Sequence, residues 1–134
     1  MKPLRILPLF LLLAASKLSG QQSASFWING GWEGIGFQPG YGDWAISLSA
    51  NEESQGHYQI RYPSLDCGGI WELQKEESGV LWFKETLYYG KDRCVDQGSV
   101  AITRVDDNHI SFSYFNPNLN ALSSYSTLTR VAVP

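Results

Sequence analysis

The sequence predicts an all-β protein whose eight strands form an antiparallel up-and-down barrel. Three observations support this prediction: short segments of alternating apolar and polar residues, turn residues between them, and connections whose lengths differ in a regular way. Every second connection is short and acidic. In an antiparallel meander alternate connections lie at the same end, so the short connections would share one rim and the longer ones the other. The acidic connections are residues 51–54, 76–78 and 106–108.

The alternation defines the predicted strands in order along the chain. Each is rich in Trp, Tyr, Phe, Ile or Val, and each is bounded by Gly, Pro, Asn or Asp, which favour turns. The predicted strands are residues 31–37, 43–49, 56–62, 69–75, 80–89, 99–105, 109–115 and 125–131. From the second strand to the seventh, alternate positions form one apolar face. This face contains Trp44, Ile46 and Leu48, then Tyr58, Ile60 and Tyr62, then Trp71 and Leu73, then Leu81, Phe83 and Leu87, then Val100 and Ile102, and finally Ile110, Phe112 and Tyr114.

A sheet with one continuous apolar face must bury that face. The sequence contains no long helix that could cover it, and a sheet that closes on itself also leaves no exposed edge strand. A closed barrel therefore fits best, and a β-sandwich of seven or eight strands is the alternative. Such a barrel would have a closed floor at the rim of short turns and an open mouth at the rim of longer loops.

Residues 1–20 have the pattern of a signal peptide. Lys2 and Arg5 precede an apolar run at residues 9–15, which is too short to span a bilayer, and cleavage after Gly20 or after Ala24 fits the pattern. The remaining residues, 25–134, are expected to form a single secreted or periplasmic β-barrel domain without a membrane span. Without the leader the chain keeps 7 Lys and Arg against 13 Asp and Glu, a formal net charge of −6. Nucleic acid is therefore not an expected partner.

Two cysteines, Cys67 and Cys94, are expected to form a disulfide if the protein is exported. Both fall in connections of the longer-loop rim, so they can meet without crossing the core. The bond would stabilise the fold by roughly 3 to 4 kcal/mol. A metal site or a catalytic thiol lacks supporting ligands, because neither His57 nor His109 lies at metal-ligand spacing from a cysteine. No metal and no cofactor is expected.

The chain resembles the calycins, the superfamily of lipocalins, fatty-acid-binding proteins and avidins. Gly30, Gly31 and Trp32 open the first strand like the lipocalin Gly-x-Trp motif, with Gly30 in the glycine position, and Arg130 stands near the end of the last strand. The resemblance implies that Trp32 lies at the barrel floor with Arg130 packed on its ring, a cation–π contact that stabilises closure. A lipocalin's second motif and its flanking helix are not found in the sequence.

A second resemblance involves the middle of the chain. Residues 62–69, with Glu85, Gly90 and Cys94 after them, are similar to a small domain of unassigned function in bacterial extracytoplasmic and signalling proteins. This resemblance implies no activity.

The rim of longer loops is the predicted functional end. It gathers residues 38–42, 63–68, 90–98 and 116–123, the last of which could form a short helical turn over the mouth or a solvated connector. Aromatic side chains with polar tips suit the flat faces of small ligands, although aromatic residues also fill small barrels. The predicted ligand-binding residues are Tyr41, Trp44, Tyr62, Trp71, Glu85, Tyr89, Tyr114 and Tyr125.

Glu85 is the one acidic residue on the apolar face of its strand, between Phe83 and Leu87. A buried carboxylate needs partners. It would either anchor a cationic or hydroxylated ligand, or pair with an interior arginine, a tyrosine hydroxyl or backbone N–H groups.

These observations predict an exported, non-enzymatic protein that binds a small apolar or amphipathic molecule at the aromatic mouth. The alternative is a protein-interaction module with a packed interior, such as an inhibitor of a secreted hydrolase, whose partner would be a secreted protein. Catalysis has little support, because the chain lacks a nucleophile elbow, a His-Glu-x-x-His helix and a phosphate-binding loop.

Overall fold

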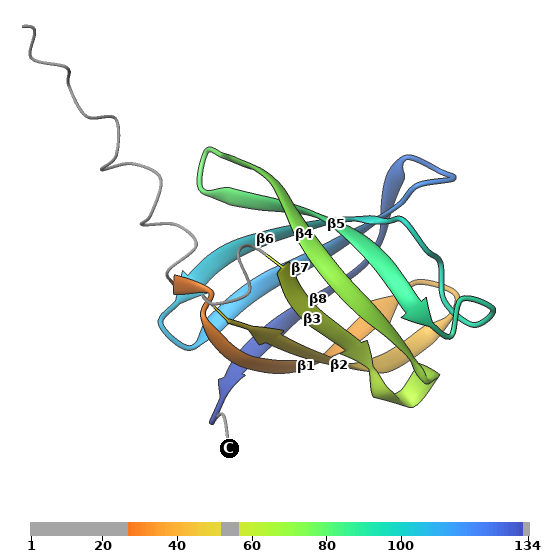
Figure 1. Ribbon diagram of the computed structural model, residues 1–134, viewed down its shortest axis with the longest axis horizontal. Helices are drawn as coiled ribbons and strands as arrows, with labels where there is room; N and C mark the ends of the chain where they lie inside the picture. Colours follow the sequence, from red (N-terminus) through yellow and green to blue (C-terminus); the bar gives the residue numbers. More distant parts are fainter. Residues whose placement is uncertain (1–26, 52–56, 133–134) are drawn as a thin grey trace, which may run out of the picture.

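A computed structural model describes residues 27–51 and 57–132, which form a closed eight-stranded barrel (Figure 1). The order of strands around the barrel is their order in the sequence, and each strand is antiparallel to its neighbours. The strands are β1 (Gly30–Gln38), β2 (Gly42–Ala50), β3 (His57–Tyr62), β4 (Cys67–Glu77), β5 (Val80–Tyr89), β6 (Ser99–Asp106), β7 (His109–Asn116) and β8 (Ala121–Val131), with a short 3-10 helix, η3 (Pro63–Leu65), between β3 and β4.

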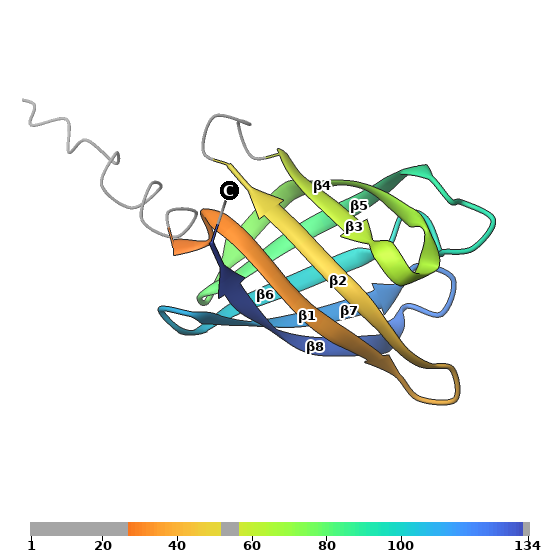
Figure 2. The same ribbon diagram turned by 90° about the horizontal axis from the view of Figure 1, so that it is seen from below.

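Pairing between the first and last strands closes the barrel. Trp32 on β1 stands opposite Arg130 on β8, and Phe37 stands opposite Tyr125. Figure 2 shows β1 between β2 and β8. This closure confirms the predicted fold class and decides against a sandwich.

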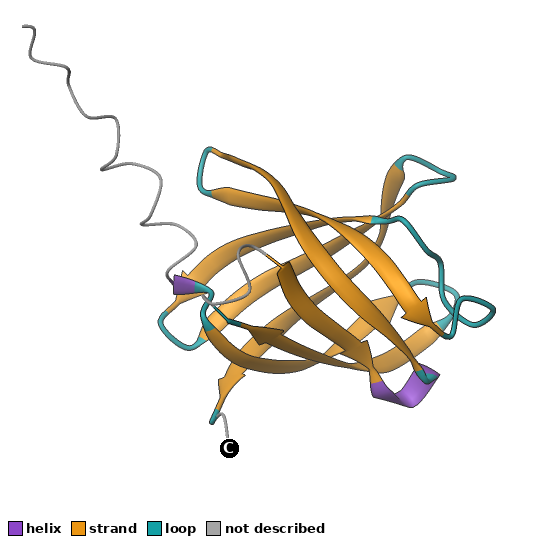
Figure 3. Ribbon diagram, viewed as in Figure 1, coloured by secondary structure: helices purple, strands orange, loops and turns teal. Residues whose placement is uncertain are grey.

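Two connections at each end of the barrel show the predicted difference in length. Tight turns join β4 to β5 and β6 to β7 at one end, whereas η3 and the long β5–β6 loop lie at the other (Figure 3). Ser78 and Gly79 both have positive φ in the β4–β5 turn, which lets the chain reverse within two residues. Of the first acidic turn, residues 52–54 lie outside the described residues, as does the predicted signal peptide.

The predicted loop at residues 116–123 is wrong, because β8 begins at Ala121. Asn116 and Asn120 explain the early start. The side-chain oxygen of Asn116 accepts a hydrogen bond from the amide of Asn118, and its carbonyl accepts one from the amide of Asn120, which has a φ of 46°. Ala121 stands opposite Asn116, so residues 121–123 belong to β8, and residues 117–120 form one tight turn closed by the Asn116 carbonyl.

The predicted apolar face is buried inside the barrel, apart from Leu73, which is partly buried. Aromatic rings fill its middle: Trp71 stacks on Phe112 with ring centroids 5.7 Å apart, and Phe83 packs against Trp71 and Tyr58. Aliphatic side chains from β2, β3, β5, β6 and β7 occupy the remaining space. No helical segment in the described part of the chain has the length and apolar character that a membrane crossing requires.

The floor of the barrel has the Trp32–Arg130 contact that the resemblance implies. The guanidinium carbon of Arg130 lies 4.2 Å from the centre of the Trp32 ring. The guanidinium also donates hydrogen bonds to the carbonyls of Trp27, Asn29 and Asp107, and it thereby joins the segment before β1 to the β6–β7 turn. Arg130 therefore closes this end through both its charge and its hydrogen bonds.

Candidate ligand-binding site

The end opposite the floor contains a cavity of about 270 Å³. Its outer part is lined by exposed side chains such as Tyr41, which is 63% exposed, and its inner part by buried ones such as Glu85, which is 1% exposed. Trp44, Tyr62 and Tyr114 form much of its wall. The cavity is therefore an aromatic funnel with a carboxyl group at its inner end.

Glu85 points inward because β5 alternates strictly between the two faces of the sheet. Leu81, Phe83, Glu85 and Leu87 are all buried, whereas Lys84 between them is exposed. The backbone amide of Glu85 donates to the carbonyl of Gly98, 2.9 Å away, so the β5–β6 loop fixes the strand at this point. The period of the strand thus places the carboxyl group inside the barrel.

The carboxyl group of Glu85 is held through one of its oxygens. The Tyr62 hydroxyl donates to Oε2 across 2.5 Å, and the Trp71 indole N–H donates to the same atom across 2.8 Å. Oε1 accepts no hydrogen bond from the described part of the chain, and it is not sealed from solvent. Since Glu85 lines the cavity, Oε1 is the oxygen available to a bound molecule.

Burial raises the pKa of Glu85 from 4.5 to about 7, although the hydrogen bonds from Tyr62 and Trp71 oppose this rise. The negative charge of Asp96 adds to it. Burial, followed by the charge of Glu85, also raises the pKa values of Tyr62 and Tyr114. Near neutral pH, therefore, both tyrosines keep their protons while Glu85 is poised to ionise.

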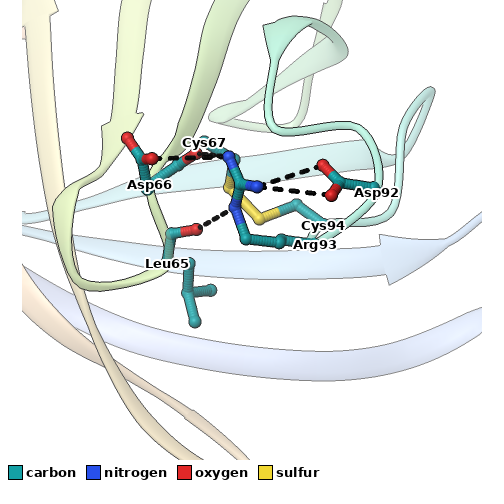
Figure 4. Close-up of polar contacts among 6 residues, drawn as sticks. All are labelled: Leu65, Asp66, Cys67, Asp92, Arg93 and Cys94. Atoms are coloured by element: carbon teal, nitrogen blue, oxygen red, sulfur yellow. Dashed lines mark hydrogen bonds and ion pairs between the residues drawn. A yellow bond between two sulfur atoms is a disulfide. The ribbon is translucent and has the colours of Figure 1, made fainter.

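Two covalently joined segments frame one side of the mouth. Cys67, at the start of β4, and Cys94, in the β5–β6 loop, form the predicted disulfide, with Cα atoms 6.5 Å apart. Beside it, the Arg93 guanidinium donates to the carbonyls of Leu65 and Asp66 at 3.1 and 2.8 Å (Figure 4). The same guanidinium pairs with the carboxylates of Asp66 and Asp92. The η3 corner and the β5–β6 loop are thus fixed to each other.

Asp96 holds the other part of the β5–β6 loop. Its Oδ1 accepts hydrogen bonds from the backbone amides of Leu87 and Gln97, each at 2.9 Å, and these bonds lower the pKa of its carboxyl group. The Tyr114 hydroxyl donates to the carbonyl of Val95 at 3.0 Å. The loop is thereby tied to β5, to β7 and, through the disulfide, to β4.

The structure brings together five of the predicted ligand-binding residues: Tyr41, Trp44, Tyr62, Glu85 and Tyr114 line the cavity. Tyr41 and Trp44 form an edge-to-face pair with ring centroids 6.2 Å apart. Trp71 is fully buried and lies beneath the site, where it supports Glu85.

Tyr89, at the end of β5, and Tyr125, opposite Phe37 near the end of β1, lie close to this rim, but neither lines the cavity. On β8 the inward positions are those of Ser124 and Leu128, so Tyr125 faces outward and packs edge-on against Phe37 with centroids 5.7 Å apart. Tyr89 is 45% exposed. A register shift between Gly68 and Gly69 displaces the end of β5, and the Tyr89 ring lies over Gly68.

The structure adds wall residues that were not among the predicted ligand-binding residues. Ser124, Phe112, Leu65 and Val95 line the cavity together with polar side chains at its mouth. Phe112 belongs to the predicted apolar face, but a serine facing inward on a strand has no distinctive signal. Among the described residues, no group of three or more His, Cys, Asp or Glu side chains is arranged to hold a metal ion.

Comparisons of the chain with models of protein families, with curated proteins and with solved structures found no match. Its function must therefore be inferred from its own residues and their geometry.

Proposed function

We propose that this chain is an exported, non-enzymatic, calycin-like protein that binds a small, partly apolar molecule in the cavity at the open end of the barrel. Its volume of about 270 Å³ lies just below the range of about 300–1,000 Å³ that is usual for ligand sites. Aromatic walls with a few polar groups at the inner end are typical of such sites. A compact ligand would fit best.

The observation that most strongly supports the proposal is the unshared oxygen of Glu85. Burying a carboxyl group disfavours folding unless its oxygens are hydrogen-bonded. Oε2 has two donors from the chain, whereas Oε1 has none among the described residues. A ligand that donates to Oε1 would complete the shell of hydrogen bonds around this carboxyl group.

The rigid frame of the mouth also supports ligand binding. The disulfide, the Arg93 hydrogen bonds and Asp96 fix the loops before any ligand arrives. Less conformational entropy would then be lost on binding. The disulfide is compatible with an oxidising compartment, in agreement with the proposed export.

A protein-interaction module with a packed interior is the less favoured function. It would not need a cavity, and it would not need a buried carboxyl group open to that cavity. Buried side chains fill the barrel between Trp71 and the floor, whereas the cavity lies between Trp71 and the open end.

Titration with small aromatic fragments, followed by amide NMR shifts, tests the proposal. We expect shifts to cluster at Ala45, Leu65, Val95 and Ser124, around the cavity. Ser124→Trp should fill the cavity and abolish them, whereas Tyr125→Ala, on the outer surface, should leave them unchanged. Shifts elsewhere, or an equal response from folded Ser124→Trp, would contradict the proposal.

A further inference from the structure

We propose that the group recognised by Glu85 is a protonated amine on an apolar body, as in an arylalkylamine. This inference rests on the proposed function, since it names the class of ligand for the same cavity. Three features support it: the lack of free hydrogen-bond donors at the inner end of the cavity, the negative charge there, and the aromatic walls.

The polar hydrogens around Glu85 are already used. A tyrosine hydroxyl and an indole nitrogen each have one hydrogen to donate. Those of Tyr62 and Trp71 go to Oε2 of Glu85, and that of Tyr114 goes to the carbonyl of Val95. When Glu85 is ionised, its Oε1 and the hydroxyl oxygens of Tyr62 and Tyr114 can therefore only accept further hydrogen bonds.

An ammonium group is the natural complement of this set of acceptors. It brings three N–H donors, whereas a neutral hydroxyl brings one. Ser124 supplies a hydroxyl that can donate, but it lies on β8, three strands from Glu85 around the barrel. A ligand with only acceptors would leave Oε1 of the ionised carboxylate unsatisfied.

The charge around the site also favours a cation. Glu85 has no ion pair with any described residue. The carboxylate of Asp96 lies 3.9 Å from the Lys91 ammonium, but its negative charge still raises the pKa of Glu85. Arg93 lines the outer cavity, but its guanidinium is already paired with Asp66 and Asp92. No described cation therefore neutralises Glu85, and an anionic ligand would be repelled.

The walls suit a cation attached to an apolar body. Trp44, Tyr62 and Tyr114 present aromatic surface beside the carboxyl group. Aromatic faces attract ammonium groups, and they also cover apolar rings. An amine with an aromatic body would use both properties.

Binding should depend on pH through Glu85. The charged and titratable groups that face it are Tyr62 from β3, Tyr114 from β7 and Asp96 from the β5–β6 loop. Both tyrosines are protonated near neutral pH and Asp96 is ionised, so Glu85 is the group of this cluster that titrates there. Its pKa of about 7 means that amine binding should strengthen as the pH rises through that value.

Calorimetric titration with three probes that share a 2-phenylethyl group tests this inference. The probes are 2-phenylethylamine, 2-phenylethanol and 3-phenylpropionate. At about pH 8 we expect the amine to bind at least about tenfold more tightly than the alcohol, as for hydrogen bonds to a charged group. The carboxylate should bind most weakly. At about pH 5.5, where Glu85 is mostly protonated, the preference for the amine should largely disappear.

Two isosteric variants isolate the carboxylate. Glu85→Gln should remove the preference for the amine, and Glu33→Gln, on the exposed face of β1, should keep it. If Glu85→Gln does not fold, the pH dependence of the unmodified protein still decides the question, since it needs no variant.

Equal or tighter binding of the alcohol or the carboxylate would overturn the amine inference and leave the proposed ligand cavity intact. The same holds for an amine preference that persists unchanged at low pH. If none of the three probes binds, the inference also fails. The proposed function fails as well only if the small aromatic fragments of the NMR titration also cause no shifts in the cavity amides.

Discussion

The hydroxyl of Tyr62 donates a hydrogen bond to Oε2 of Glu85 across 2.5 Å, although the two residues belong to strands that are not neighbours. β4 lies between β3 and β5, and its Trp71 donates to the same oxygen. Three adjacent strands thus hold one carboxyl oxygen and leave the other open to the cavity. Both the proposed ligand site and its pH dependence follow from this arrangement.

The stability of the ligand-free protein should depend on the protonation of Glu85. Its pKa is raised from 4.5 in the unfolded chain to about 7 in the folded protein. The proton therefore favours the folded state below pH 4.5, and this contribution is lost as the pH rises through about 7. Relative to Glu85→Gln, the unfolding free energy of the unmodified protein should fall by about 3 kcal/mol over this interval, at about 1.4 kcal/mol per pKa unit.

Urea denaturation across this pH interval measures the effect. Glu33→Gln is the matched control, because Glu33 is exposed and its variant should follow the unmodified protein. If the difference in unfolding free energy between the unmodified protein and Glu85→Gln stays constant with pH, Glu85 does not have the raised pKa.

Removing either donor to Oε2 should raise the pKa of Glu85 above about 7. Both hydrogen bonds favour the ionised carboxylate, so Tyr62→Phe and Trp71→Phe each remove a stabilising contact from the charged form. Carbon-13 NMR titration of the Glu85 carboxyl group measures the change. An unchanged or lower pKa in both variants would mean that these hydrogen bonds do not hold the carboxylate.

Arg130→Lys should weaken the barrel floor, although it keeps the positive charge. A lysine cannot serve the three carbonyls of Trp27, Asn29 and Asp107 in the fork geometry of a guanidinium. We expect a loss of about 2 kcal/mol, together with faster amide hydrogen exchange around residues 27–29. Arg61→Lys, on the exposed face of β3, should cost far less. Equal losses in the two variants would contradict the role given to Arg130.

Gly90 and Gly40 provide a matched pair that tests the frame of the mouth. Both have positive φ, so alanine should cost about 1 to 2 kcal/mol of backbone strain at either position. At Gly40 the new Cβ meets nothing within 4 Å, whereas at Gly90 it would come within 2.4 Å of the Asp66 carbonyl and the Cys67 Cβ. Gly90→Ala should therefore be the more destabilising by thermal denaturation, and it should disturb the cavity amides. Equal effects would show that the β5–β6 loop is not packed against the start of β4.

Opening the disulfide should reduce stability without abolishing the barrel. Cys67 and Cys94 are 27 residues apart in sequence, and cross-links over such loops contribute about 3 to 4 kcal/mol. The Cys67→Ala/Cys94→Ala variant should lose this amount in urea denaturation and become insensitive to reductant. Since Arg93 still joins the two segments, the cavity amides should shift while those at the floor stay in place. A variant as stable as the unmodified protein would contradict this account.

The sequence predicted most of the fold because period-two alternation survives in nearly every strand. The acidic turns and the cysteines were enough to orient the barrel and to place the disulfide at the mouth. The start of β8 could not be predicted, because Asn116, Pro117 and Asn118 have loop character whether the turn is long or short. Only the hydrogen bonds of the Asn116 side chain and carbonyl show that the turn is tight.

The site was partly predictable for the same reason. Glu85 stood out as an acidic residue at an inward position, but its partners depend on the register of β3, β4 and β5. The sequence pattern did not show which residues of the last strand face inward; the structure places Ser124 inside the barrel and Tyr125 outside. Arg93 was not singled out within the predicted loop 90–98, because its role depends on carbonyls 27 and 28 residues away in sequence.

Native mass spectrometry of the protein purified gently from its own host shows whether the barrel carries a small ligand. We expect a small non-covalent adduct that disappears in Trp44→Ala, because Trp44 forms part of the cavity wall, and persists in Tyr125→Ala, on the outer surface. A bare protein, or one accompanied by a second polypeptide in place of a small molecule, would contradict this expectation.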